Sequence, residues 1–534
     1  MPDEARWRFG WWLDQWRVTT REQRRTGLLA AGSALVGLAV AATSVVASGP
    51  WDSGQRTAER QRAASGARTG GGQHGPGPAP APSAALVLAP LGAPTQSPTP
   101  RTGEQSVPMP TGPGLSDALG PLLKDDALGP LRAGAVVDAA TGRQLFDAKA
   151  NSAAVPASVI KLVTGVAALS ALGPGHRLTT TVATVPGDTG RIVLVGGGDP
   201  TLTARATHGP ESARPASLRQ LADDTARALG ARDQRNVRLD YDTSLYSGPV
   251  LHPIGPNENL APVTALMADE GRRDDSERGP ADRAKDPAAD AARTFAGLLR
   301  DRGIKVTGDP RHHRRPGAAA EANDAKGAAG GRGANGAQAG EDDQGSADTT
   351  LATVRSQPLS ALVERALTNS DNDIAEALAR HTALATGRPA SFAGARDAVT
   401  AQLKKLGLPV AGARFADGSG LDRDDKVSSA LLAQVLVRAA DPGQPALRPV
   451  LTGLPIAGFT GTLRDRYAKD AVGRGVVRAK TGTLTGVNTL AGTVVDADGR
   501  LLTFAFVTNG TDDPHAAQRA LDRLASALAN CGCR

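Results

Sequence analysis

The chain has 534 residues, 40% of them hydrophobic, and carries a formal charge of +7 at pH 7. This length allows two or three domains with a sizeable core. The charge is modest for the length, and the part expected to fold has no basic stripe interleaved with aromatic residues, so nucleic acid is not expected as a partner. The only cysteines, Cys531 and Cys533, do not suggest a redox enzyme, and whether they pair with each other or with another chain stays open.

The first 48 residues predict a membrane anchor. Residues 26–48 contain no charged side chain and consist largely of Leu, Val and Ala, so as a helix they are long enough to cross a bilayer. Six arginines precede them, and the positive-inside rule therefore puts residues 1–25 in the cytoplasm and the rest of the chain outside the cell membrane. Cleavage of this stretch as a signal peptide, which would give a secreted protein, is the alternative.

Residues 49–114 predict a disordered linker. They contain 12 prolines among 66 positions, and Gly, Ala, Ser and Thr fill most of the others, so no core can form there. The folded region is expected to begin near Leu115. Its first predicted element is a hairpin with strands at Ala135–Asp138 and Arg143–Asp147.

The first chemical motif is Ser158-Val159-Ile160-Lys161. The apolar stretch from Pro156 to Leu169 predicts a helix with Ser158 in its first turn, and Lys161 follows one turn later on the same face. Apolar neighbours should desolvate the lysine and lower its pKa, which suits a general base for a serine nucleophile. The spacing alone also fits an ordinary surface helix.

Residues 176–350 predict a large inserted region with its own secondary structure. Strands are expected at Arg191–Val195 and Asn236–Tyr241, and a helix at about Ala288–Arg300. Residues 311–348 contain no Val, Leu, Ile, Met or aromatic residue and predict a disordered loop within the insert.

The second motif, Ser370-Asp371-Asn372, lies in a polar connection between two helical patterns. Ser370 could pass a proton toward a leaving group, while the amide of Asn372 offers donors and an acceptor to a substrate. The alternative from this segment alone is an N-cap, in which Ser370 or Asp371 caps the second helix.

The third motif, Lys480-Thr481-Gly482-Thr483, is expected at the end of a strand at Gly475–Ala479. Alternating apolar residues and an Asp-Gly turn then predict a hairpin of Asn488–Asp496 and Arg500–Thr508, followed by a helix from about His515 to Leu528. An edge strand with this motif can pair with an extended peptide.

We expect Lys480 on this strand, which also bears the hydroxyls of Thr481 and Thr483, to meet the terminal carboxylate of such a peptide. The missing side chain of Gly482 would let the peptide backbone lie flat against the strand. Strands at both ends of the folded region, with helices between them, predict an α+β fold in which helices cover one antiparallel sheet. This catalytic domain is formed by residues 115–175 and 351–534.

In combination, the three motifs resemble those of the penicillin-recognising serine acyltransferases, which include penicillin-binding proteins and serine β-lactamases. Three further segments, at 137–142, 196–202 and 417–421, are similar to those of the D-alanyl-D-alanine carboxypeptidase/endopeptidases, the class C low-molecular-mass penicillin-binding proteins. The interval of 209 positions between Lys161 and Ser370 also matches the large insert of that family.

The resemblance covers roughly residues 115–534 and implies a penicillin-binding transpeptidase-like fold without cofactor or metal. It implies a serine-type D-Ala-D-Ala carboxypeptidase that acts on peptidoglycan stem peptides through an acyl-enzyme on Ser158 and is acylated by penicillin and other β-lactams. Endopeptidase activity and the oligomeric state stay open. The implied catalytic residues are Ser158, Lys161, Ser370 and Asn372, and the implied substrate-binding residues are Lys480, Thr481, Gly482 and Thr483.

The resemblance further implies that Lys161 takes the serine proton, that Ser370 relays it, and that the backbone N–H groups of Ser158 and Thr483 form the oxyanion hole. Two other functions use the same motifs. One is a serine β-lactamase, although no E-x-x-L-N segment occurs between Asn372 and Lys480. The other is a non-catalytic penicillin-binding wall protein, in which the motif residues would have decayed.

Overall fold

The computed structural model describes residues 107–206, 214–313, 350–468 and 471–532. The predicted anchor at 26–48 and most of the predicted linker lie outside these residues. No helix of the described part is both long and apolar enough to span a membrane. The first helix, α4 (Gly112–Leu119), begins a few residues before the predicted start of the fold, because the side chain of Thr111 caps it by accepting a hydrogen bond from the backbone N–H of Gly114.

The first of two sheets has five antiparallel strands in the order β2-β1-β11-β10-β9. They are β1 (Leu131–Asp138), β2 (Gln144–Ala148), β9 (Arg478–Leu484), β10 (Val487–Val495) and β11 (Leu501–Asn509). Strands from both ends of the folded region thus meet in one sheet, which confirms the predicted α+β fold.

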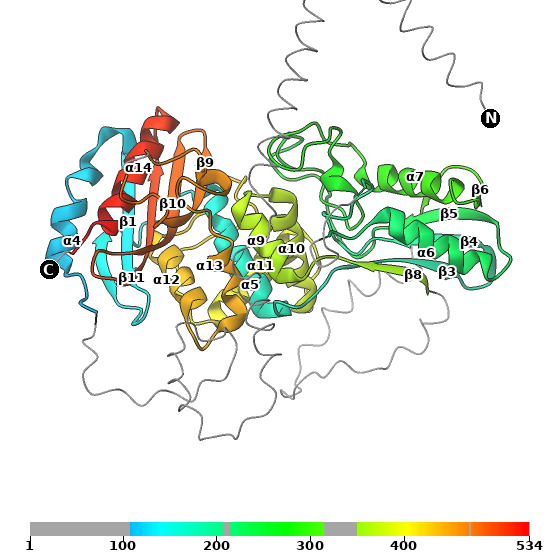
Figure 1. Cartoon of the computed structure of the whole chain (residues 1–534), viewed down its shortest axis with the longest axis horizontal. Helices are drawn as coiled ribbons and strands as arrows, with labels where there is room; N and C mark the ends of the chain where they lie inside the picture. The colour runs from blue at the N-terminus through cyan, green and yellow to red at the C-terminus, as the bar shows by residue number, and fades with distance from the viewer. Residues whose placement is uncertain (1–106, 207–213, 314–349, 469–470, 533–534) are drawn as a thin grey trace, which may run out of the picture. The chain divides into compact units, whose positions relative to one another are not determined.

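Helices cover both faces of this sheet (Figure 1). Alternate residues of β11 point to opposite faces: Ala505 and Val507 join the core with α12, while Phe504 and Phe506 join the core with α14. The helices of the first core are α5 (Ile160–Leu172), α9 (Leu359–Thr368), α10 (Asn372–Ala385), α11 (Phe392–Lys405), α12 (Ser429–Ala440) and α13 (Pro449–Thr452). The second core contains α4 and α14 (Pro514–Ala529).

Strand β9 differs from its prediction. The motif residues Lys480–Thr483 lie inside the strand instead of following it, because they pair in register with β10, with Thr483 opposite Asn488. Gly475, where the strand was expected to begin, has a φ of 77° and lies in a preceding turn. Strand β9 is the edge strand of the sheet, as predicted.

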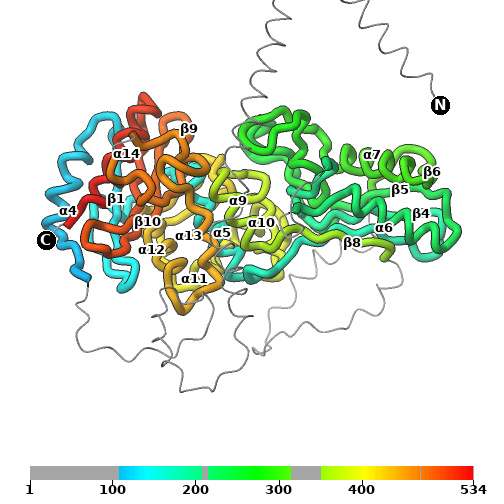
Figure 2. Tube along the Cα trace, viewed as in Figure 1, coloured from blue at the N-terminus to red at the C-terminus, as the bar shows by residue number. Residues whose placement is uncertain are grey.

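The second sheet is built from residues between α5 and α9, as the course of the tube in Figure 2 shows. Its strand order is β6-β5-β4-β3-β8, and β7 also pairs with β5. The strands are β3 (Thr179–Val185), β4 (Asp188–Val195), β5 (Asn236–Asp242), β6 (Lys305–Val306), β7 (Arg311–His312) and β8 (Thr350–Arg355). The helices α6 (Leu218–Gly230) and α7 (Pro287–Arg300) pack on it around a separate apolar core.

Two details of this region correct the sequence analysis. Arg311 and His312, which fall at the start of the predicted disordered loop, form β7, because their backbone pairs with Asp240 and Tyr241 of β5. The last strand, β8, runs to Arg355 and so passes the predicted end of the insert at residue 350. Most of the remaining loop lies outside the described residues.

Candidate active site

Ser158 lies in η3 (Ala157–Val159), a short 3-10 turn that leads directly into α5. The α-helix begins at Ile160, so the serine precedes the first α-helical turn in which it was predicted. The preceding residue, Ala157, has a φ of 49°, a left-handed conformation that is strained for a residue with a side chain. Ser370 of the second motif is also left-handed, with a φ of 59°. Both motif serines are therefore at or next to strained backbone.

Two glycines allow the strained turn to be held from both sides. A Cβ atom on Gly482 of β9 would lie 2.5 Å from the carbonyl oxygen of Pro156, and one on Gly420 would lie 2.1 Å from the carbonyl oxygen of Ala157. Neither approach is possible for a residue with a side chain. The role expected for Gly482 thus needs correction: its missing side chain makes room for the turn before Ser158, not for a substrate backbone.

The side chain of Lys161 is buried beneath Ser158, with 2% exposure. Its ammonium donates hydrogen bonds to Oγ of Ser158 at 2.9 Å, to Oδ1 of Asn372 at 2.7 Å and to the carbonyl oxygen of Ser419 at 2.5 Å. Burial lowers the pKa of Lys161 to about 8, although nearby carboxylates, Asp417 foremost, oppose the shift. A neutral amine has two N–H groups, which suffice for Asn372 and Ser419, and its lone pair then faces Ser158.

The second and third motifs together form another serine and lysine pair. Nζ of Lys480 donates to Oγ of Ser370 at 2.9 Å and to the carbonyl oxygen of Thr481 at 2.7 Å. Burial and the charge of Lys161 together lower the pKa of Lys480 well below its ordinary value. Asp371 caps α10 by accepting a hydrogen bond from the backbone N–H of Ile374 at 3.0 Å. Both interpretations of this motif therefore hold, on adjacent residues: Asp371 is the N-cap, and Ser370 contacts Lys480 at the pocket.

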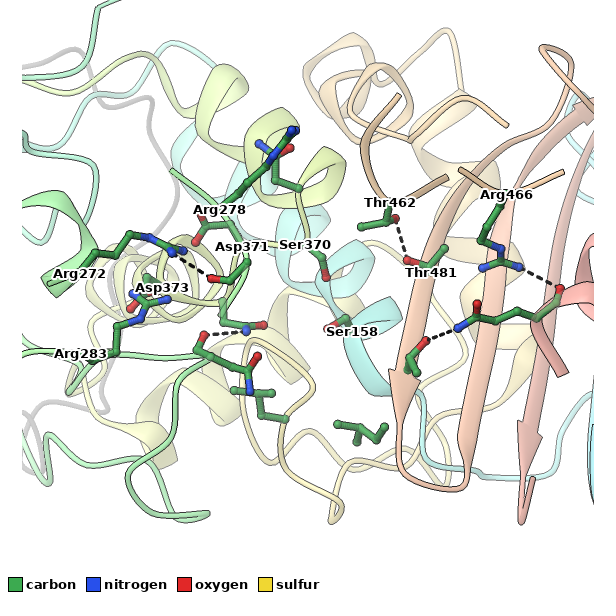
Figure 3. Close-up of a pocket in the computed structure, with 18 residues that line it drawn as sticks. Ser158, Arg272, Arg278, Arg283, Ser370, Asp371, Asp373, Thr462, Arg466 and Thr481 are labelled. Atoms are coloured by element: carbon green, nitrogen blue, oxygen red, sulfur yellow. Dashed lines mark hydrogen bonds and ion pairs between the residues drawn. The ribbon is translucent and has the colours of Figure 1, made fainter. Parts of the chain in front are cut away.

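These side chains surround one pocket of about 380 Å³ (Figure 3). Ser158, Ser370, Asn372, Thr481 and Thr483 line it. The other three predicted site residues, Lys161, Lys480 and Gly482, are behind this lining; Lys480 is fully buried and reaches the pocket through Ser370.

Thr462 and Arg466, which the sequence analysis missed, extend the wall formed by β9. The hydroxyl of Thr462 in η7 (Gly461–Leu463) lies 2.7 Å from that of Thr481. Arg466 binds both carboxylate oxygens of Asp522 in α14, at 2.6 and 3.2 Å. No local pattern marks either residue, since both lie between the second and third motifs, in or just after the short 3-10 turn η7.

A loop at 417–422 supplies the carbonyl oxygen of Ser419 that binds Lys161. The carboxylate of Asp417 holds this loop by accepting hydrogen bonds from the backbone N–H groups of Ser419, Gly420, Leu421 and Asp422 and from the hydroxyl of Ser419. Nε2 of His252, a residue of the insert, lies 2.9 Å from the same carboxylate. The sequence analysis noted this segment only for its similarity to the family; in the structure the insert supports it as a loop that binds Lys161.

Three buried carboxyl groups lie in this region, and Asp417 is the most acidic of them. Burial alone would raise the pKa of Asp417, but His252 and the backbone N–H groups of the loop bring it down to about 2. Burial and the charge of Asp417 raise the pKa of Glu376 to about 7 and that of Asp425 to about 10. At neutral pH Asp417 is therefore charged and Asp425 stays protonated beside it, while Glu376 is close to the midpoint of its titration.

The insert forms the wall of the pocket opposite β9. Nδ2 of Asn372 donates to the carbonyl oxygen of Asn259 at 2.8 Å, and Arg283 lies 2.9 Å from the carboxylate of Asp373. A buried network of charges continues behind this wall, where Glu270 binds Arg272 and Arg365. The second motif is thus fixed by the catalytic domain on one side and by the insert on the other.

A serine held against a desolvated lysine, a second serine and lysine pair and an edge strand with hydroxyls define an active-serine enzyme of acyl transfer. The model of the D-Ala-D-Ala carboxypeptidase 3 (S13) family matches residues 115–278 and 329–528. The chain belongs to this family, which confirms the resemblance, and is accordingly a serine carboxypeptidase, a hydrolase.

The names of similar proteins agree with this assignment. The chain is 38% identical over 436 residues to the carboxypeptidase DacB of Mycolicibacterium smegmatis, which covers 80% of this chain and 86% of the relative. It is 31% identical over 452 residues to the D-alanyl-D-alanine carboxypeptidase of an Actinomadura species, covering 75% of this chain and 82% of the relative. Among solved structures, penicillin-binding protein 4 of Haemophilus influenzae matches with a TM-score of 0.58 and 22% identity over 78% of this chain and 98% of that one, which shows a shared fold.

Proposed function

We propose that this protein removes the terminal D-alanine from peptidoglycan stem peptides through an acyl-enzyme on Ser158. The observation that carries the proposal is the contact of Lys161 with Ser158 at 2.9 Å, made by a buried amine whose pKa is lowered to about 8. A base with a pKa near the working pH is the most effective at taking a proton from a hydroxyl.

In the acylation step, Lys161 accepts the hydroxyl proton of Ser158 while Oγ bonds to the carbonyl carbon of the penultimate D-alanine. The backbone N–H groups of Ser158 and Thr483 would stabilise the oxyanion, as in the related enzymes. The carbon–nitrogen bond then breaks, and Ser370 passes a proton to the departing amine. Lys480 donates a hydrogen bond to Ser370 and can replace this proton. The proton that Lys161 took from Ser158 then restores Lys480, so that Lys161 is neutral again when hydrolysis begins.

Hydrolysis of the ester completes the reaction. A water molecule gives its proton to Lys161 and its oxygen to the acyl carbon, so that the shortened peptide leaves as a carboxylic acid and Ser158 regains its proton. β-Lactams would acylate the same serine, but their ring-opened amine stays attached and impedes the water.

The terminal carboxylate of the substrate is assigned to the β9 wall. The hydroxyls of Thr481 and Thr483 line the pocket there, while Lys480 is fully buried. This supports direct contacts from the two threonines and a contribution of Lys480 through its charge. A bound carboxylate would favour the charged form of Lys480 and so oppose the lowering of its pKa.

The test is release of D-alanine from a synthetic pentapeptide that ends in D-Ala-D-Ala. The purified full chain should release it, and Ser158→Ala should abolish the release. The control is Ser152→Ala, which changes an exposed serine in the segment between β2 and η3 and should retain the release. Equal release by the Ser158→Ala variant and the unmodified protein would refute the proposal.

We further propose that residues 26–48 anchor the protein in the cell membrane with the catalytic domain outside. The support is the uncharged apolar stretch and the six arginines before it. Membrane fractions of cells that express the full chain should retain the protein, and deletion of residues 26–48 should prevent this. If the full-length gene product were instead recovered from the medium as a shortened chain that lacks residues 26–48, this would favour a cleaved signal peptide.

A further inference from the structure

The active-site pocket has an excess of cationic groups on the wall that the insert forms. Four arginines and two aspartates contribute to the pocket lining. Most of these charges are compensated: Arg283 binds Asp373, Arg272 binds Glu270, and Arg466 binds Asp522 on the opposite wall. Their guanidinium groups are therefore committed to the fold.

Arg278 is different. Its side chain is exposed, and it has no hydrogen bond or ion pair with any of the residues that the structure describes. Both carboxylates of the lining have other partners: Asp371 accepts a hydrogen bond from Ile374 and lies 3.6 Å from Nε of Arg365, and Asp373 binds Arg283. An uncompensated guanidinium at the wall of a pocket favours an anionic ligand.

The position of Arg278 indicates which part of a ligand it would meet. It shares the pocket lining with Asn369 and Ser370 (Figure 3). Arg278 and Asn369 also line a neighbouring cavity, together with Ser276, Glu277 and Arg365. Ser370 is the proposed donor to the departing amine, so this end of the pocket belongs to the leaving group. D-Alanine has one carboxylate, which the threonines of β9 can bind across the pocket.

We propose that the guanidinium of Arg278 forms a subsite for a second carboxylate on the leaving group, opposite the threonines that bind the first. The enzyme would then prefer leaving groups that carry an acidic side chain or an acidic peptide over a neutral residue of the same size. This inference rests on the proposed function, because the leaving side is defined by Ser370.

The test uses two peptides that differ only in the charge of the leaving residue. One ends in D-Ala-D-Glu and the other in D-Ala-D-Gln, and cleavage of both is followed by release of the last residue. The measured quantity is the ratio of their kcat/KM values, which is insensitive to the fraction of folded enzyme. An ion pair made by an exposed arginine should give a ratio of up to about fivefold in favour of D-Glu.

Three variants make the test specific. Arg278→Ala should bring the ratio to about one, and Arg278→Glu should invert it. The control is Arg273→Ala, since Arg273 is an exposed arginine five positions earlier that lines a different cavity and should keep the ratio of the unmodified enzyme. Raising the salt concentration should lower the ratio only in enzymes that retain Arg278.

A ratio near one in the unmodified enzyme, or an Arg278→Ala variant that keeps the preference, would overturn the subsite. So would an enzyme that releases D-alanine but cleaves neither of these two peptides, because the pocket would then not admit the larger leaving residue that carries the second carboxylate. Each of these results leaves the proposed function intact as long as cleavage depends on Ser158. Cleavage that survives Ser158→Ala would instead refute the proposed function.

Discussion

Oδ1 of Asn372 accepts a hydrogen bond from Nζ of Lys161 at 2.7 Å, although 211 positions separate the two residues. The same amide donates to the carbonyl oxygen of Asn259 in the insert at 2.8 Å. Asn372 therefore links the lysine of the first motif to the insert that lies between the motifs in sequence. The orientation of the Lys161 amine toward Ser158 depends on this acceptor.

Replacement of this amide by an apolar group of similar size should slow acylation. In Asn372→Leu, one N–H of Lys161 loses its acceptor, and the loss of a hydrogen bond to a charged group corresponds to about 10- to 100-fold in rate. The measurement is the rate of labelling by a fluorescent penicillin. Asn151→Leu, at an exposed asparagine, is the matched control and should label at the original rate. Equal rates in both variants would contradict this role of Asn372.

The rate of acylation should rise with pH through a single ionisation near pH 8. Burial lowers the pKa of Lys161 to about 8, and the amine accepts the serine proton only in its neutral form. The labelling rate should thus increase between pH 6 and 8 and level off above pH 9. Lys161→Arg, whose guanidinium stays charged, should label at least about 1000-fold more slowly throughout. A rate that is constant from pH 6 to 9 would exclude Lys161 as the base.

A methyl group at Gly482 should impair acylation more than folding. The added Cβ would lie 2.5 Å from the carbonyl oxygen of Pro156, so β9 must move away from the turn that carries Ser158. Overpacking of this kind costs about 1–3 kcal/mol. Gly482→Ala should therefore remain folded by thermal denaturation while its penicillin labelling falls strongly. The control is Gly187→Ala, a left-handed glycine in open space, which should lose some stability but no labelling.

The carboxylate of Asp417 should be required for both stability and catalysis. Asp417→Asn puts an NH2 group against backbone N–H donors of the loop at 417–422 and weakens the contact with His252, at a cost of about 3 kcal/mol. The free energy of unfolding, measured in urea, should fall by this amount, and labelling of the folded variant should slow because Ser419 moves away from Lys161. An unchanged labelling rate would show that the loop does not position the lysine.

The contribution of His252 to stability should depend on pH. Burial lowers the pKa of His252, but the hydrogen bond to Asp417 raises it more, so the net shift is upward. Because the pKa is higher in the folded than in the unfolded state, protonation of His252 stabilises the fold. This stabilisation is complete below the unfolded pKa of about 6.5 and is lost as the pH rises through the folded pKa. The difference in unfolding free energy between the unmodified protein and His252→Ala should therefore be larger at pH 6 than at pH 9. An equal difference at both values would contradict a charged pair.

The three motifs could be recognised in the sequence, and the two hairpins could be predicted from it, because their signals are local. Ser158 and Lys161 lie three positions apart where η3 leads into α5, and the Asp-Gly turn before Arg500 specifies a hairpin. The contacts that complete the site are not local. Ser419 binds Lys161 through its backbone carbonyl oxygen, which no residue type marks, and His252 reaches Asp417 from 165 positions away.

The sequence also could not predict that Lys480 is buried or why a glycine is needed at position 482. Gly482 is required because β9 approaches the turn at Pro156 and Ala157 closely, and Lys480 is buried where it meets Ser370; both are properties of tertiary packing. The short strands of the insert were predicted only in part, because runs such as Lys305–Val306 and Arg311–His312 are too short and polar for a periodic pattern. They form because β5 offers both of them a neighbouring strand.

The most direct test of the central claim is to locate the covalent adduct that a penicillin forms with the full chain. Intact mass spectrometry should find one added penicillin per molecule, and digestion should assign it to the peptide that contains Ser158. The Ser158→Ala variant should gain no mass, while Ser370→Ala should still be modified, only more slowly. An adduct on any residue other than Ser158, or an adduct on the Ser158→Ala variant, would contradict the account.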